Sequence, residues 1–99
     1  MRVRFTREAF QRLEGIRRFL ALDSAQMADD VLQSIVSHAE SLSTLPRRGR
    51  VVPEYQRDDI RELLVYPPYR IIYRVGLDEV TVLSVMHGHQ LLPDDLGPE

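Results

Sequence analysis

The first half of the chain combines a short alternating stretch with two stretches of helical spacing. Polar and apolar side chains alternate over residues 2–6, which predicts a short strand with one buried face. Thr6 is placed to cap a first helix, and Asp23 and Ser24 are placed to cap a second helix that ends by Pro46. The apolar stripes expected to pack inward are Ala9, Leu13, Ile16 and Leu20, then Ala28, Val31, Leu32, Ile35, Ala39 and Leu42.

The second half is rich in strand signals after a loop expected at residues 46–58. Three strands are predicted, at Ile60–Tyr66, Tyr69–Val75 and Val80–His87, joined by tight turns. Residues 93–99 are expected to form an irregular tail. The predicted order is therefore β-α-α-β-β-β, an α+β domain over residues 1–92 with a helical hairpin on one face of a mostly antiparallel sheet.

Period two within the strands sorts side chains into faces and isolates a group of arginines. In the middle strand, Arg70 and Arg74 alternate with the four residues expected to pack against the helices, Tyr69, Ile71, Tyr73 and Val75. Together with Arg61 of the preceding strand, they are expected to form one cationic face beside apolar residues. Such a face suits a phosphate-bearing or acidic ligand, and it equally suits a partner peptide with an apolar stripe.

The last predicted strand is apolar on both faces, so it is expected in the interior of the sheet. Its sides are expected to carry Leu83, Val85 and His87 on one face, and Val82, Ser84 and Met86 on the other.

Length and composition narrow the class of protein. Ninety-nine residues fit one domain, and the absence of cysteine excludes disulfides and thiolate zinc sites. The amino terminus is too charged for the apolar core of a secretory signal, and no apolar stretch approaches the length of a membrane span. We therefore expect a soluble, cytoplasmic domain that binds neither a membrane nor a cofactor.

The net charge of −2 conceals two basic blocks. Residues 1–18 carry a net charge of +4 and residues 47–74 carry +3, while the intervening and final segments are acidic. All 13 basic residues are arginine, which a GC-rich genome explains without reference to function. Codon usage does not explain the clustering: Arg47, Arg48 and Arg50 form either a loop that faces nucleic acid or a solvated loop.

Two histidines end the last predicted strand and are the candidate catalytic groups. His87 or His89 could move protons beside arginines that hold a phosphate, assisting attack of a ribose 2′-hydroxyl. The alternative is a histidine that packs at the strand end or bonds a backbone carbonyl. No metal site is predicted, because the two histidines and the later Asp94 and Asp95 lack the spacing of a known ligand set.

The segment YPPYRIIYRV, followed by VTVLSVMHGHQLLP, resembles the RelE/ParE superfamily of toxins from bacterial type II toxin–antitoxin pairs. The Phe-Thr-x-x-Ala junction after the first strand, Leu45-Pro46-x-x-Gly49 and Arg61-Glu62 fit the same pattern, in order, from Val3 to about Leu92. The resemblance implies the β-α-α-β-β-β fold and a cognate antitoxin that neutralises the toxin. We expect an acidic, amphipathic antitoxin segment to dock on the surface of Arg70 and Arg74.

The superfamily divides by target, and the residues favour one branch. RelE-like members cleave mRNA on the ribosome, and Arg61 and Arg70 match basic positions of their site. Leu63 and Val65 stand where basic groups are often found, and Gly88 stands where a catalytic arginine is common. ParE-like members inhibit DNA gyrase without nuclease groups. The sequence therefore resembles ParE-like members more closely, with an mRNA endonuclease as the alternative.

Overall fold

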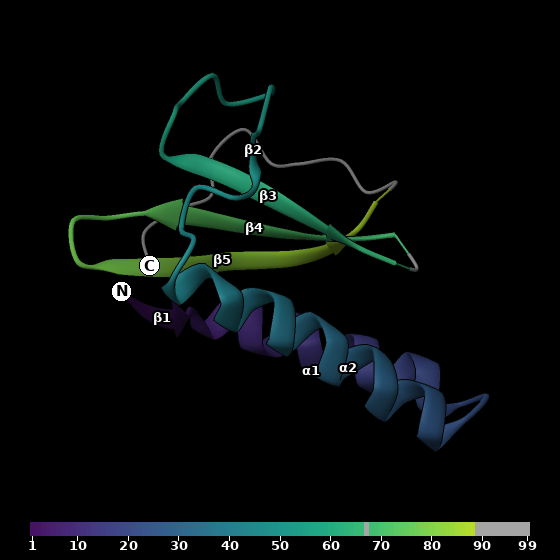
Figure 1. Cartoon of the computed structure of the whole chain (residues 1–99). Coiled ribbons are helices and arrows are strands. Elements are labelled where there is room, and N and C mark those ends of the chain that lie inside the picture. The colour runs from purple at the N-terminus through teal and green to yellow at the C-terminus, as the bar shows by residue number, and fades with distance from the viewer. Residues whose placement is uncertain (67, 89–99) are drawn as a thin grey trace.

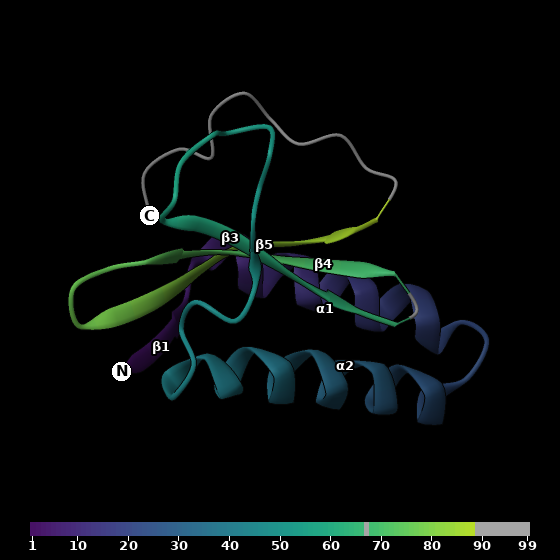
Figure 2. The same ribbon diagram turned by 45° about the horizontal axis from the view of Figure 1, so that its top comes forward.

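The computed structural model of the chain describes residues 1–66 and 68–88, so His89 and the expected tail at 93–99 lie outside the described residues. Its elements are β1 (Arg2–Phe5), α1 (Arg7–Ala21), α2 (Ala25–Glu40), the 3-10 turn η1 (Ser41–Ser43), β2 (Arg50–Val51), β3 (Ile60–Val65), β4 (Tyr69–Val75) and β5 (Glu79–His87). The sheet order is β1-β5-β4-β3-β2, with β1 parallel to β5 and the other pairs antiparallel. Both helices cover the same face of this sheet (Figures 1 and 2). The predicted α+β order is confirmed, with the two-residue β2 as an addition inside the expected loop.

The helices begin where side-chain oxygens can accept backbone N–H groups. Thr6 Oγ1 accepts the N–H of Ala9 at 3.1 Å, and Ser24 Oγ accepts the N–H of Met27 at the same distance. Of the two predicted caps of the second helix, Ser24 is therefore the residue used. This helix ends at Glu40, well before Pro46, and the chain continues as η1. Within the described residues, no helix has both the length and the apolar character needed to cross a bilayer.

Two apolar clusters lie on opposite faces of the sheet. The larger one packs the helical stripes against β3, β4 and β5 and includes Ile35, Ile71 and Tyr73, all 0% exposed. The smaller one lies on the other face and consists of Val52, Ile60, Ile72, Leu83 and Met86, with Tyr55 packed against it. The segment between β2 and β3 arches over this second face (Figure 2). The sheet is therefore covered in part on both sides, which agrees with the apolar character predicted for its last strand.

The register between β3 and β4 separates the arginines that were expected to share a face. Arg61 pairs with Tyr73 and therefore lies on the helix-covered face, whereas Leu64 pairs with Arg70. Arg70 and Arg74 consequently point to the opposite face from Arg61. The expectation of one surface with all three was wrong, because period two relates side chains within a strand and says nothing about the pairing between strands.

A bulge in β5 also changes the predicted faces of that strand. Tyr73 pairs with Val82 and Ile72 pairs with Ser84, which leaves Leu83 as the extra residue. Val82 therefore joins the helix-side cluster, and Leu83 joins the opposite cluster. The predicted grouping of these two residues was wrong for this reason. Thr6 reaches this point from the start of α1: its N–H donates to the Val82 carbonyl at 3.0 Å and its hydroxyl to the Leu83 carbonyl at 3.1 Å.

Candidate functional site

Arg70 is held on the sheet face away from the helices by a buried carboxylate. Its guanidinium Nε and Nη2 lie 2.7 and 2.6 Å from Glu62 Oε1. Glu62 is 1% exposed and Arg70 is 8% exposed. The second oxygen of Glu62 accepts a hydrogen bond from Nε of Arg50, so one carboxylate joins two guanidinium groups. Glu54 adds a more distant carboxylate, 3.7 Å from Arg70 Nη2.

This geometry gives Arg70 a structural role in the sheet. A buried carboxylate requires both charge compensation and hydrogen bonds, and Arg70 supplies both from the neighbouring strand. A phosphate could bind the same edge of Arg70 only by displacing Glu62, which would leave that carboxylate buried without its partner. The role of Arg70 in holding a phosphate stays a prediction, and its surroundings argue against that role.

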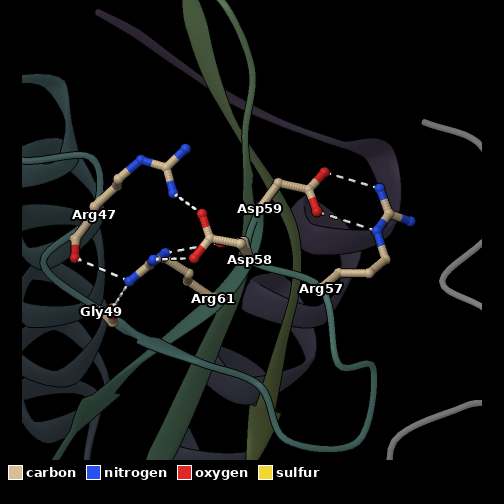
Figure 3. Close-up of polar contacts among 6 residues, drawn as sticks. All are labelled: Arg47, Gly49, Arg57, Asp58, Asp59 and Arg61. Atoms are coloured by element: carbon tan, nitrogen blue, oxygen red, sulfur yellow. Dashed lines mark hydrogen bonds and ion pairs between the residues drawn. The ribbon is translucent and has the colours of Figure 1, made fainter.

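Arg61 is used in a second, separate cluster that fixes the loop before β2 (Figure 3). Its guanidinium donates to the Asp58 carboxylate at 2.8 Å and to the Gly49 carbonyl at 2.9 Å. Asp58 also accepts a hydrogen bond from Arg47, so this carboxylate bridges two arginines. The side chain of Arg61 is only 15% exposed. Through these contacts, Arg61 connects Gly49 with Asp58, near the two ends of the segment that covers the sheet.

The neighbouring pair of Arg57 and Asp59 is bidentate, with distances of 3.1 and 2.8 Å (Figure 3). The hydrogen bonds from Arg57 lower the pKa of Asp59 below its ordinary value. Arg74, which is half-buried, adds a smaller electrostatic contribution in the same direction.

The glycine of the Leu45-Pro46-x-x-Gly49 motif is required by close packing of the backbone. Its buried N–H donates to Tyr73 Oη at 2.9 Å. A Cβ at this position would lie 2.4 Å from the Glu62 carbonyl oxygen and 2.6 Å from Tyr73 Oη. Only glycine allows the backbone to approach so closely. Burial of the Tyr73 hydroxyl at this point raises its pKa. The motif therefore positions the loop against β3 and β4.

His87 lies on the opposite face of the sheet from Arg70. It pairs with Tyr69, and the two rings pack edge to face with centroids 5.8 Å apart. Arg70 pairs with the next residue back along β5, Met86, and so points the other way. The structure does not bring His87 together with Arg70 as a proton-moving and phosphate-holding pair.

A groove beside His87 is a feature that the sequence did not reveal. It has a volume of about 610 Å³ and lies between α1 and the ends of β4 and β5. Its lining consists of Arg12, Gly15, Ile16, Phe19, Tyr69, Val85 and His87. The available signal was Phe19, a large apolar residue outside the predicted stripe, which is 70% exposed. The groove is therefore mostly apolar, and Arg12 is the one arginine among the described residues of its lining.

The remaining predicted arginines lie near the start of β2. Arg47, Arg48 and Arg50 are exposed, and Arg48 donates to Ser41 Oγ. This loop therefore presents cations at the surface, which fits a loop that faces nucleic acid and a solvated loop equally well. Among residues 1–66 and 68–88, no three His, Cys, Asp or Glu side chains gather in a way that could hold a metal ion.

Comparisons with known proteins agree with this architecture. Residues 3–92 match a family model described as "ParE toxin of type II toxin-antitoxin system, parDE". The putative toxin Y4kP of Sinorhizobium fredii is 34% identical over 95 residues, covering 96% of both chains. Toxin RelE2 of Caulobacter vibrioides is 31% identical over 87 residues, covering 88% of this chain and 94% of the relative. A solved structure, the chromosomal ParDE system from P. aeruginosa, superposes with a TM-score of 0.73 at 24% identity, covering 88% of this chain and 95% of that one.

Proposed function

The chain belongs to the ParE toxin family of type II toxin–antitoxin systems, and from that premise we propose that it inhibits DNA gyrase by binding, without cleaving RNA. The resemblance identified in the sequence is thereby confirmed at the level of the family. A type II toxin implies an antitoxin as partner. The proposed site of action is the cytoplasm, where gyrase and the antitoxin both reside.

The observation that carries the proposal is the pairing of Arg70 with Glu62. An RNA-cleaving site needs cations free to stabilise charge on a phosphate, and preorganised cations contribute most when they face the reacting group. Arg70, which matches a basic position of the RelE-like set, instead faces a buried carboxylate at 2.6–2.7 Å. Arg61 faces Asp58 and backbone carbonyls on the other side of the sheet. Both arginines are thus engaged within the fold.

The position of His87 supports the same choice. General acid–base catalysis requires a proton-moving group within hydrogen-bond reach of the reacting atoms. His87 and Arg70 project from opposite faces of one sheet, so a single phosphate cannot contact both. Inhibition by binding requires no such pair, and it can use exposed surface such as the groove between α1 and the strand ends.

The experiment that tests the proposal is DNA supercoiling by purified gyrase. Relaxed plasmid, ATP and gyrase are mixed with increasing amounts of the purified chain, and the supercoiled product is resolved on a gel. We expect the product to disappear as the chain reaches and exceeds the gyrase concentration. Full supercoiling at a large excess of folded chain would overturn the proposal.

A second candidate function is ribosome-dependent mRNA cleavage, because one relative carries the name Toxin RelE2. In that case His87 or His89 would move protons, and a cation on the His87 side of the sheet, such as Arg12 in the same groove, would hold the phosphate. Primer extension on mRNA after induction in cells would then show new 5′ ends. These ends should vanish in a chain carrying both His87→Ala and His89→Ala. Intact mRNA during growth arrest would exclude this candidate.

A further inference from the structure

We propose that the outer edge of β3, beyond the end of β2, accepts an extended acidic segment of the antitoxin as an added strand. This inference rests on the antitoxin partner that the proposed function includes, and it specifies where that partner binds. The starting observation is the unequal length of the two strands. β2 pairs with Glu62 and Arg61 only, while β3 continues to Val65. Three further residues of β3 therefore extend past their neighbour.

The direction of the backbone groups shows which of these residues faces outward. The Val52 N–H donates to the Ile60 carbonyl at 3.1 Å, so the polar groups of Ile60 face β2. The Val75 N–H donates to the Asp59 carbonyl at 2.8 Å, so those of Asp59 face β4. Because this direction alternates along a strand, the N–H and C=O of Leu64 face outward, away from β4.

No described residue continues the ladder to Leu64. The register of Arg50 with Glu62 would place Arg48 opposite Leu64. However, the chain turns away there, and the Arg48 N–H donates to the Leu45 carbonyl at 3.1 Å. The edge at Leu64 therefore offers one donor and one acceptor to an incoming strand, which is the requirement for strand addition.

The side chains at this edge are apolar and open to solvent. Leu64 is 62% exposed and Tyr66 is 92% exposed. Edge strands are normally protected by charged side chains, proline or a covering segment, and these two residues provide none. The other edge of the sheet differs: Arg2 and Arg4 of β1 bind Glu79, and the terminal amine of Met1 donates to the Ser43 carbonyl in η1. The β3 edge is therefore the better acceptor.

Charge indicates the chemistry of the partner. Around the start of β2 and in the two clusters beside it, the arginines outnumber the carboxylates. There are five arginines, Arg47, Arg48, Arg50, Arg61 and Arg70, against three carboxylates, Glu54, Asp58 and Glu62, and the first three arginines are exposed. A strand added at Leu64 would run toward this basic end. A second copy of the chain would present an equally basic surface, whereas a segment with acidic side chains would be attracted. We therefore assign the edge to an acidic segment of the antitoxin.

Amide exchange tests the assignment directly. The ¹⁵N-labelled chain is measured by NMR alone and with the purified protein encoded by the adjacent gene. Strand addition predicts that exchange at the Leu64 amide slows by about 100-fold or more in the complex, because an outward N–H becomes hydrogen-bonded. The amide of Leu77, in the exposed β4–β5 turn, serves as the control and should not change. A complex that forms with unchanged exchange at Leu64 overturns this inference and leaves the proposed function standing. Failure of the adjacent protein to bind at all also overturns this inference, while the supercoiling assay decides the proposed function separately.

Substitution at the same residue provides the second arm. Leu64→Pro removes the outward N–H at an edge position where proline is tolerated, and Leu64→Ala keeps it. Both variants are first compared by thermal melting. The Kd for the adjacent protein should rise about 100-fold for the proline variant and clearly less for the alanine variant. Equal losses in two folded variants would contradict strand addition. If the proline variant fails to fold, the exchange measurement decides.

Discussion

The guanidinium of Arg70 and the carboxylate of Glu62 form an ion pair that is buried between neighbouring strands, with Arg70 Nη2 2.6 Å from Glu62 Oε1. The two residues are diagonal neighbours on one face, since Glu62 pairs with Ile72 and Arg70 pairs with Leu64. An arginine in a motif of the superfamily is thus part of the framework of the sheet. Several properties of the protein follow from this framework.

Removing the carboxylate should destabilise the fold strongly. Glu62→Ala leaves Arg70 buried without its partner, and breaking such a pair costs roughly 3–5 kcal/mol of unfolding free energy. The control is Glu54→Ala, whose side chain is 51% exposed and lies 3.7 Å from the same guanidinium. That change should cost about 1 kcal/mol or less. Urea denaturation of both variants measures the difference, and similar values for the two would contradict the structural role of Glu62.

Two glycines should respond in opposite directions to alanine. Gly49→Ala places a Cβ 2.4 Å from the Glu62 carbonyl oxygen, so the loop must move and the hydrogen bond to Tyr73 is lost. Gly15, within α1, has no atom within 4 Å of an added Cβ. Gly15→Ala should therefore raise the unfolding free energy by about 0.5–1 kcal/mol, while Gly49→Ala lowers it. Thermal melting of the two variants checks the signs, and a stabilised Gly49→Ala would show that the close approach is absent.

Acid should weaken the connection between β1 and β5. Glu79 accepts hydrogen bonds from Arg2 and Arg4, at 2.9 and 3.1 Å, and these bonds lower the pKa of Glu79. A carboxyl whose pKa is lowered by folding stabilises the fold above its unfolded-state pKa. That contribution is lost as the pH falls from the ordinary value of 4.5 through the lowered one. Replacing both arginines by alanine should return the pKa of Glu79 toward its ordinary value in an NMR titration. An unchanged titration curve would contradict the pairing.

Local features of the fold could be predicted because they depend on neighbouring residues. Thr6 and Ser24 were identified as caps, and the limits of the strand Tyr69–Val75 were predicted correctly. Side-chain oxygens at helix starts and β-branched or aromatic runs act over a few positions. β2 was missed because a two-residue strand has no period to detect, and it exists only through its pairing with β3.

The arrangement of the candidate site depended on contacts that the sequence does not encode locally. Arg61 and Arg70 lie on opposite faces because of the strand register. Val82 and Leu83 each lie on the face opposite to the predicted one because of the bulge in β5. Glu62 was the available signal, because a carboxylate between Ile60 and Leu64 in a buried strand requires a cation. The groove beside Phe19 could not be predicted, because its walls come from α1 and from the ends of β4 and β5, which are far apart in the sequence.

We propose that this toxin inhibits gyrase by binding, and this can be measured with purified components. The most direct test is the supercoiling of relaxed plasmid by purified gyrase with the chain present, followed by addition of the protein from the adjacent gene. Supercoiling should stop when the chain exceeds gyrase and should resume when the adjacent protein is added in excess. Undiminished supercoiling at every concentration of folded chain would contradict this proposal.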